Sequence, residues 1–113
     1  MSGRNSDEPR FEPVEGGRSV VRGLLGFSTV AMLLAPGSAA IEQGRAAVID
    51  LAAVTQSDSS GLALLIEWLS VALEAGRPLR YENIPAQLHQ LARLSDVDAL
   101  ISENRFAGLE AGG

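Results

Sequence analysis

Residues 46–73 read AAVIDLAAVTQSDSSGLALLIEWLSVAL, and this alternation of apolar and polar segments decides the fold. The apolar run 46–51 predicts a buried strand, and its nearly continuous apolar character suits a strand covered on both faces. The polar segment 55–60 predicts a crossover loop, and the leucine-rich sequence after it predicts a helix from Gly61 to a stop at Gly76. Function often collects where a strand gives way to a helix, because the first helical N–H groups point outward there.

The sequence before this stretch predicts a hairpin and a helix. Residues 11–14 and 19–26 are apolar enough for two strands, and Glu15-Gly16-Gly17-Arg18 between them favours a hairpin turn. Residues 27–29 offer a hydroxyl N-cap for a first helix over 30–43, which we expect to be interrupted near Pro36.

The sequence after the stretch predicts one more strand and one more helix. Residues 78–81 form a short apolar-polar run, and Pro85 suits the first turn of a helix that reaches Leu94. Residues 97–101 fit a last short strand or helical turn. The order β-β-α-β-α-β-α predicts an α/β fold with parallel strand pairs and right-handed crossovers.

The chain length fits a single domain. The sequence has 113 residues, 46% of them hydrophobic and 20% charged. We expect residues 1–10 to be a disordered lead, 11–101 to be the domain and 102–113 to be a flexible tail. The most apolar window, 24–35, is too short to cross a bilayer.

The motif in the decisive stretch resembles a known family. Residues 50–65 read Asp-Leu-x-x-Val-x-x-x-Asp-Ser-x-Gly-Leu-Ala-Leu-Leu, which resembles the core signature of STAS domains. Gly-Leu-Ala-Leu-Leu after the loop resembles the MlaB-type branch most closely, and residues 84–94 are similar to the final helix of that family. The resemblance covers roughly residues 18–101. It implies a STAS-like mixed sheet of four to five strands, with helices packed mainly on one side.

The resemblance also implies a function. MlaB-type proteins are small cytoplasmic STAS subunits of the ABC transporter that moves phospholipid between Gram-negative membranes. It therefore implies a non-enzymatic subunit that binds and regulates or stabilises the ATPase subunit of such a complex, which maintains outer-membrane lipid asymmetry. The chain would be cytoplasmic and would reach the inner membrane only through its partner subunits.

Two other functions stay open for the same fold. One is an anti-sigma factor antagonist that is switched by phosphorylation of a serine, since Ser59 aligns with the phosphorylated serine of those regulators. The other is a STAS module that itself holds an apolar ligand.

Composition argues against several other classes. The net charge is −5 and there is no basic run, so we expect no nucleic-acid partner. The sequence has no cysteine and a single histidine, His89, so it predicts no metal site. It contains no P-loop, and Ser59 has no neighbouring histidine or lysine in the sequence, so we expect neither a cofactor nor catalysis.

The Asp58-Ser59-Ser60-Gly61 loop has two interpretations. It is either a simple helix N-cap, worth about 1 kcal/mol, or part of a surface that contacts a partner. The following helix has an apolar stripe that should pack on the sheet, formed by Leu62, Leu65, Ile66, Leu69 and Leu73.

A second apolar stripe of this helix lies almost opposite the first and consists of Leu64, Trp68 and Val71. This stripe either tucks against a neighbouring helix or forms a contact patch, where tryptophan is a common anchor. The predicted partner-binding residues are Asp58, Ser59, Ser60, Gly61, Leu64, Trp68 and Val71.

Overall fold

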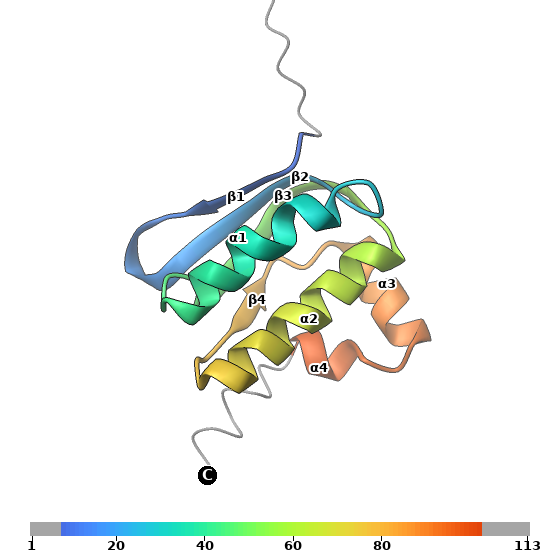
Figure 1. Cartoon of the computed structure of the whole chain (residues 1–113). Coiled ribbons are helices and arrows are strands. Elements are labelled where there is room, and N and C mark those ends of the chain that lie inside the picture. Colours follow the sequence, from blue (N-terminus) through green and yellow to red (C-terminus); the bar gives the residue numbers. More distant parts are fainter. Residues whose placement is uncertain (1–7, 103–113) are drawn as a thin grey trace, which may run out of the picture.

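The computed structural model describes residues 8–102 of the chain (Figure 1). Most of the predicted lead, 1–10, and nearly all of the predicted tail, 102–113, lie outside the described residues. At the two edges of the described part, Arg10 already begins the first strand and Ser102 still ends the last helix.

The order of the elements is the predicted one, with a short 3-10 turn between the first two strands. The elements are β1 (Arg10–Pro13), η1 (Glu15–Gly17), β2 (Arg18–Leu25), α1 (Val30–Glu42), β3 (Val48–Ser57), α2 (Ser59–Ala75), β4 (Arg80–Glu82), α3 (Ala86–Leu94) and α4 (Asp98–Ser102).

The sheet has four strands in the order β1-β2-β3-β4. β1 runs antiparallel to β2, whereas β2 with β3 and β3 with β4 are parallel pairs. The helices lie on one face of the sheet, with α1 and α2 side by side across it (Figure 1). The predicted mixed α/β fold is therefore confirmed. In the described part of the chain, no helix is both long and apolar enough to cross a membrane.

β3 differs from its prediction in two ways. It continues to Ser57, so the polar residues 55–57 belong to the strand and not to a crossover loop. Its burial alternates over its first half, with Ile49 and Leu51 buried, Asp50 partly exposed and Ala52 exposed. The strand is therefore covered on one face only, because every helix packs on the same side. The small alanines made the run look more deeply buried than it is.

α2 is held at both ends by the expected signals. Asp58 is its N-cap, and Gly76 ends it in a left-handed conformation with a φ of 67°. Glycine adopts that conformation without steric cost, which explains why the helix stops there.

The buried face of α2 is wider than the predicted stripe. Leu62, Leu65 and Leu69 are buried as expected, but Leu73 is 51% exposed and Ile66 is only half-buried. Leu64, Trp68 and Ala72 are buried as well. The reason is that α2 packs against the sheet on one side and against α1 on the other.

α1 continues through Pro36, where we expected an interruption. Pro36 has no N–H to donate to the carbonyl of Met32, but Met32 is exposed, so water can satisfy that carbonyl. The next residue, Gly37, is buried against α2. This close approach lets the two helices lie side by side.

Candidate functional site

Asp58 joins the two polypeptide turns that precede α1 and α2. Its Oδ1 atom accepts hydrogen bonds from the backbone N–H groups of Ser60 at 2.8 Å and Gly61 at 3.3 Å. Its Oδ2 atom accepts one from the N–H of Phe27, in the turn between β2 and α1, at 3.1 Å. One carboxylate therefore caps α2 and fixes the position of Phe27.

Two glycines make this arrangement possible. A Cβ atom on Gly26 would lie 2.8 Å from Oδ2 of Asp58, and one on Gly61 would lie 2.4 Å from the carbonyl oxygen of Leu25. Both positions therefore need glycine, because any side chain would push the two turns apart. Gly61 brings the start of α2 against the end of β2.

Thr29 closes the same turn in a different way from the one predicted. It occupies the N-cap position of α1, but its hydroxyl makes no capping bond to the helix. The hydroxyl instead donates to the carbonyl of Leu24 at 2.7 Å and accepts from the N–H of Gly26 at 3.0 Å. These bonds tie the turn that carries Phe27 to the end of β2.

An apolar groove lies between α1 and the N-terminal half of α2, with a volume of about 540 Å³. Its lining consists of Phe27, Val30, Ala31, Leu34, Ser60, Ala63, Leu64 and Glu67. Phe27 is 84% exposed and Leu34 is 40% exposed, which is unusual for large apolar side chains so close together. We call this feature the α1–α2 groove.

The lining of the α1–α2 groove is mostly apolar and offers little for catalysis or metal binding. Its wall on α1 is apolar, and the polar side chains in its lining are those of Ser60 and Glu67 on α2. None of the lining residues is a histidine, lysine or cysteine that could activate a hydroxyl. Among residues 8–102, no three His, Asp or Glu side chains are grouped closely enough to hold a metal ion.

The structure brings part of the predicted partner-binding set to this groove. Ser60 and Leu64 line it, whereas Asp58 and Ser59 are exposed and directly precede Ser60 in the chain without lining the groove themselves. Gly61 is buried beneath the loop. Ser59 is the first residue of α2, so its hydroxyl stands at the helix N-terminus.

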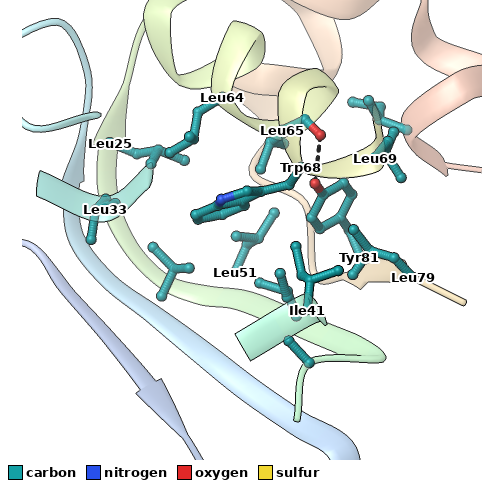
Figure 2. Packing of buried hydrophobic residues seen from close by; sticks show 14 of the residues in the cluster. Leu25, Leu33, Ile41, Leu51, Leu64, Leu65, Trp68, Leu69, Leu79 and Tyr81 are labelled. Atoms are coloured by element: carbon teal, nitrogen blue, oxygen red, sulfur yellow. Dashed lines mark hydrogen bonds between the residues drawn. The ribbon is translucent and has the colours of Figure 1, made fainter. Parts of the chain in front are cut away.

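The prediction that Trp68 faces a partner is wrong, because its side chain is 0% exposed. The indole lies among Leu25, Leu33, Leu51 and Leu64 (Figure 2). Its Nε1 atom donates to the carbonyl of Leu34 at 3.3 Å. The second apolar stripe of α2 therefore packs against a neighbouring helix, α1, as the alternative interpretation predicted.

The other two members of that stripe are also part of the packing. Leu64 is only 5% exposed, at the base of the groove, and Val71 is half-buried against the core. Neither projects from the surface as a free anchor.

The α1 wall of the groove was not predicted from the sequence. Phe27, Val30, Ala31 and Leu34 were interpreted only as part of a cap and a helix. A signal was present, since consecutive apolar residues over 30–35 cannot all face inward from a helix that packs on one side. Some of them had to remain exposed.

Comparison with known proteins defines the class. A family model described as "Mlab, STAS domain" matches residues 15–102, which is most of the chain. The chain therefore belongs to the STAS domain family, and within it to the MlaB type.

A solved structure supports the same fold. The anti-sigma factor antagonist SpoIIAA in its unphosphorylated form is similar with a TM-score of 0.59 and 22% sequence identity, over 77% of this chain and 83% of that one. At this identity the likeness shows the fold alone. No curated protein matches the chain significantly.

Proposed function

We propose that this protein is a non-enzymatic subunit that binds the ATPase subunit of a phospholipid-transport ABC complex. The observation that carries the proposal is the α1–α2 groove, with exposed Phe27 and Leu34 beside the Asp58-Ser59-Ser60 loop. The MlaB-type family match supports the choice of partner. The protein would then be cytoplasmic and would associate with the inner membrane through its partners.

The groove suits a regulatory contact because its position is fixed. Asp58 ties the backbone N–H of Phe27 to the start of α2, so the position from which the exposed ring projects is fixed before binding. A pre-organised anchor loses less conformational entropy on binding than a mobile one. Binding here would hold the ATPase in an arrangement competent for assembly and hydrolysis, and so support outer-membrane lipid asymmetry.

The test is the affinity of the ATPase subunit for folded variants of this protein. Phe27→Ala removes an exposed ring that no core contact requires, so folding should be unchanged. If the ring is a binding anchor, its loss should cost about 2 kcal/mol, or about 30-fold in Kd. Ser59→Arg should also weaken binding, because it places a charge at the edge of a desolvated contact.

Leu94→Ala is the matched control. Leu94 is 85% exposed, but it lies on α3 beside Gln90 and Arg93, apart from the α1–α2 groove. Its loss should leave the Kd unchanged. If Phe27→Ala and Ser59→Arg remain folded and bind the ATPase as tightly as the parent, the proposed function of this surface is wrong. Trp68→Ala is not a suitable probe, because it removes a core side chain.

A second candidate function is an anti-sigma factor antagonist switched by phosphorylation. Exposed Ser59 at the first position of α2 favours it, because a phosphate there would meet the positive end of the helix dipole. The fold is also shared with an antagonist of that kind. Mass spectrometry of the protein from its own cells tests whether Ser59 carries a phosphate. Phosphate on Ser59, together with no measurable binding to the ATPase, would replace the first proposal with this one.

A further inference from the structure

The two helices that form the groove carry acidic charge only. α1 and α2 contain no lysine or arginine, and their charged residues are Glu42, Glu67 and Glu74. Arginines instead occupy the strands, with Arg10, Arg18, Arg22 and Arg80 on β1, β2 and β4. The helical face around the groove is therefore acidic and apolar.

Glu67 is the acid that belongs to the α1–α2 groove. It lies seven residues after Ser60 on α2, about two helical turns along the same wall. It is exposed, and none of the ion pairs among the described residues involves it. Its carboxylate is therefore free to pair with a cation that enters the groove.

The helix N-termini near the groove would favour an anion, whereas the carboxylate of Glu67 favours a cation. Asp58 already accepts from the first free N–H groups of α2, and the dipole effect fades beyond the first turn. Glu67 lies in the third turn of α2, so its own charge dominates that part of the groove. The complementary partner group is a cation.

The shape of the groove favours a helix as the occupant. The two walls are side chains of helices, whose backbone groups are already paired within each helix. An extended peptide would find no free strand edge there, and its own N–H and C=O groups would be left unpaired. A helix satisfies its own backbone, and the wall from Ser60 to Glu67, about 10 Å long, matches two helical turns.

We propose that the partner enters the α1–α2 groove with an amphipathic helix that presents apolar side chains to α1 and a lysine or arginine to Glu67. This inference rests on the proposed function only for the identity of the partner as the ATPase subunit. The apolar side chains would pack on Phe27 and Leu34. The cation would set the direction of the helix along the groove.

The experiment measures the Kd of the ATPase subunit for the parent, Glu67→Gln, Glu67→Arg and Glu74→Arg at low and high salt. Glu67→Arg should weaken binding about 10-fold or more at low salt, because it faces a like charge. Glu67→Gln should weaken it less and should reduce its salt dependence. Glu74→Arg makes the same charge change on the same helix, outside the groove, and should leave binding within about twofold of the parent.

The outcomes separate this inference from the proposed function. If Phe27→Ala weakens binding but Glu67→Arg does not, the ATPase binds at the groove and the inference about a cation is wrong. If the parent does not bind the ATPase at all, the proposed function fails, and a pair of helical peptides decides the inference.

The two peptides carry leucines one turn apart and differ at one position, which is lysine in one and glutamate in the other. The lysine peptide should shift the backbone amide signals of Ala31, Leu34 and Ala63 in NMR spectra, and Glu67→Arg should reverse the preference between the peptides. Equal responses to the two peptides, or responses that Glu67→Arg leaves unchanged, overturn the inference.

Discussion

Trp68 shows how one side chain decides the packing of two helices. Its ring contacts Phe11 edge to face, with 5.5 Å between the ring centroids, and its Nε1 atom bonds to a carbonyl of α1. A Cβ atom on Gly37 would lie 2.2 Å from Cζ2 of the indole. The absence of a side chain at residue 37 is therefore what makes room for the indole.

We expect Gly37→Ala to destabilise the protein, by about 1–3 kcal/mol, because the clash with a fixed ring outweighs the better helix propensity of alanine. Trp68→Phe removes the ring atoms that would clash, so Gly37→Ala should cost less in that background. Urea unfolding of the parent, both single variants and the double variant measures this coupling as a thermodynamic cycle. If the two changes simply add, the indole and Gly37 do not constrain each other.

The outcome for Trp68 also shows where sequence reasoning ends for single residues. A helical wheel gives the angle of Trp68 relative to Leu62, but it does not say whether a second helix covers that side. That information lies in the position of α1, which is set by contacts between residues far apart in the sequence, such as Gly37 and Trp68. Leu73 shows the same limit, since the wheel places it on the core stripe but it is 51% exposed near the end of α2.

At the scale of elements, Asp58 and Tyr81 fasten α2 to the rest of the fold. The carboxylate of Asp58 caps α2 and holds the turn after β2, while the hydroxyl of Tyr81 on β4 donates to the carbonyl of Leu65 in α2 at 2.6 Å (Figure 2). Burial raises the pKa of Tyr81, so the phenol keeps its proton. α2 is therefore fastened to the sheet near both its start and its middle.

Asp58→Ala should lower the free energy of unfolding by about 1–2 kcal/mol, because it removes an N-cap and leaves backbone N–H groups without their acceptor. Asp58→Asn is the control, since its amide oxygen can still accept and should retain most of the stability. Hydrogen exchange should speed up at the amides of Phe27, Ser60 and Gly61 in Asp58→Ala. Unchanged exchange at Phe27 would mean that Asp58 does not hold the turn of the α1–α2 groove.

The elements themselves could be predicted well where local signals are strong. The stop of α2 at Gly76 is predicted to the residue, whereas the helix begins at Ser59, two residues before the predicted start at Gly61. The hairpin of β1 and β2 is present as predicted. The end of β3 could not be predicted, because Thr55 and Gln56 are polar on a strand whose outer face meets water. The groove could not be predicted either, because its two walls, residues 27–34 and 60–67, are far apart in the chain and meet only in the fold.

At the scale of the whole molecule, the uncovered face of the sheet carries ion pairs between arginines and glutamates. Glu12 pairs with Arg10 and Arg22 at 3.1 and 2.8 Å, and Glu82 pairs with Arg18 and Arg80 at 2.6 and 2.8 Å. The Arg22–Glu12 pair joins the neighbouring strands β2 and β1, and the Arg18–Glu82 pair reaches across β3 from β2 to β4. The other two pairs lie within β1 and within β4. The glutamates offset the charge of the arginines on this face, whereas α1 and α2 carry only acids.

The acids on this face make stability depend on pH. Hydrogen bonds from Arg18 lower the pKa of Glu82, those from Arg22 lower the pKa of Glu12, and those from Asn83 and the N–H of Ala52 lower the pKa of Asp50. An acid whose pKa is lower in the folded state binds a proton more readily when the chain unfolds. Its contribution is therefore complete above the unfolded pKa and is lost as pH falls through the folded value.

We expect the protein to lose stability as pH falls below the ordinary pKa values of 4.5 for glutamate and 3.8 for aspartate, and to keep losing it until these carboxylates are protonated. Asp50→Asn should flatten this pH dependence, because an amide does not titrate and still accepts from Ala52. Glu74→Gln is the matched control, an exposed acid on α2 outside these pairs, and should follow the parent curve. Urea unfolding measured between pH 7 and pH 3 makes the comparison. If Asp50→Asn and the parent lose stability in parallel over that range, Asp50 is not one of the acids that couple folding to pH.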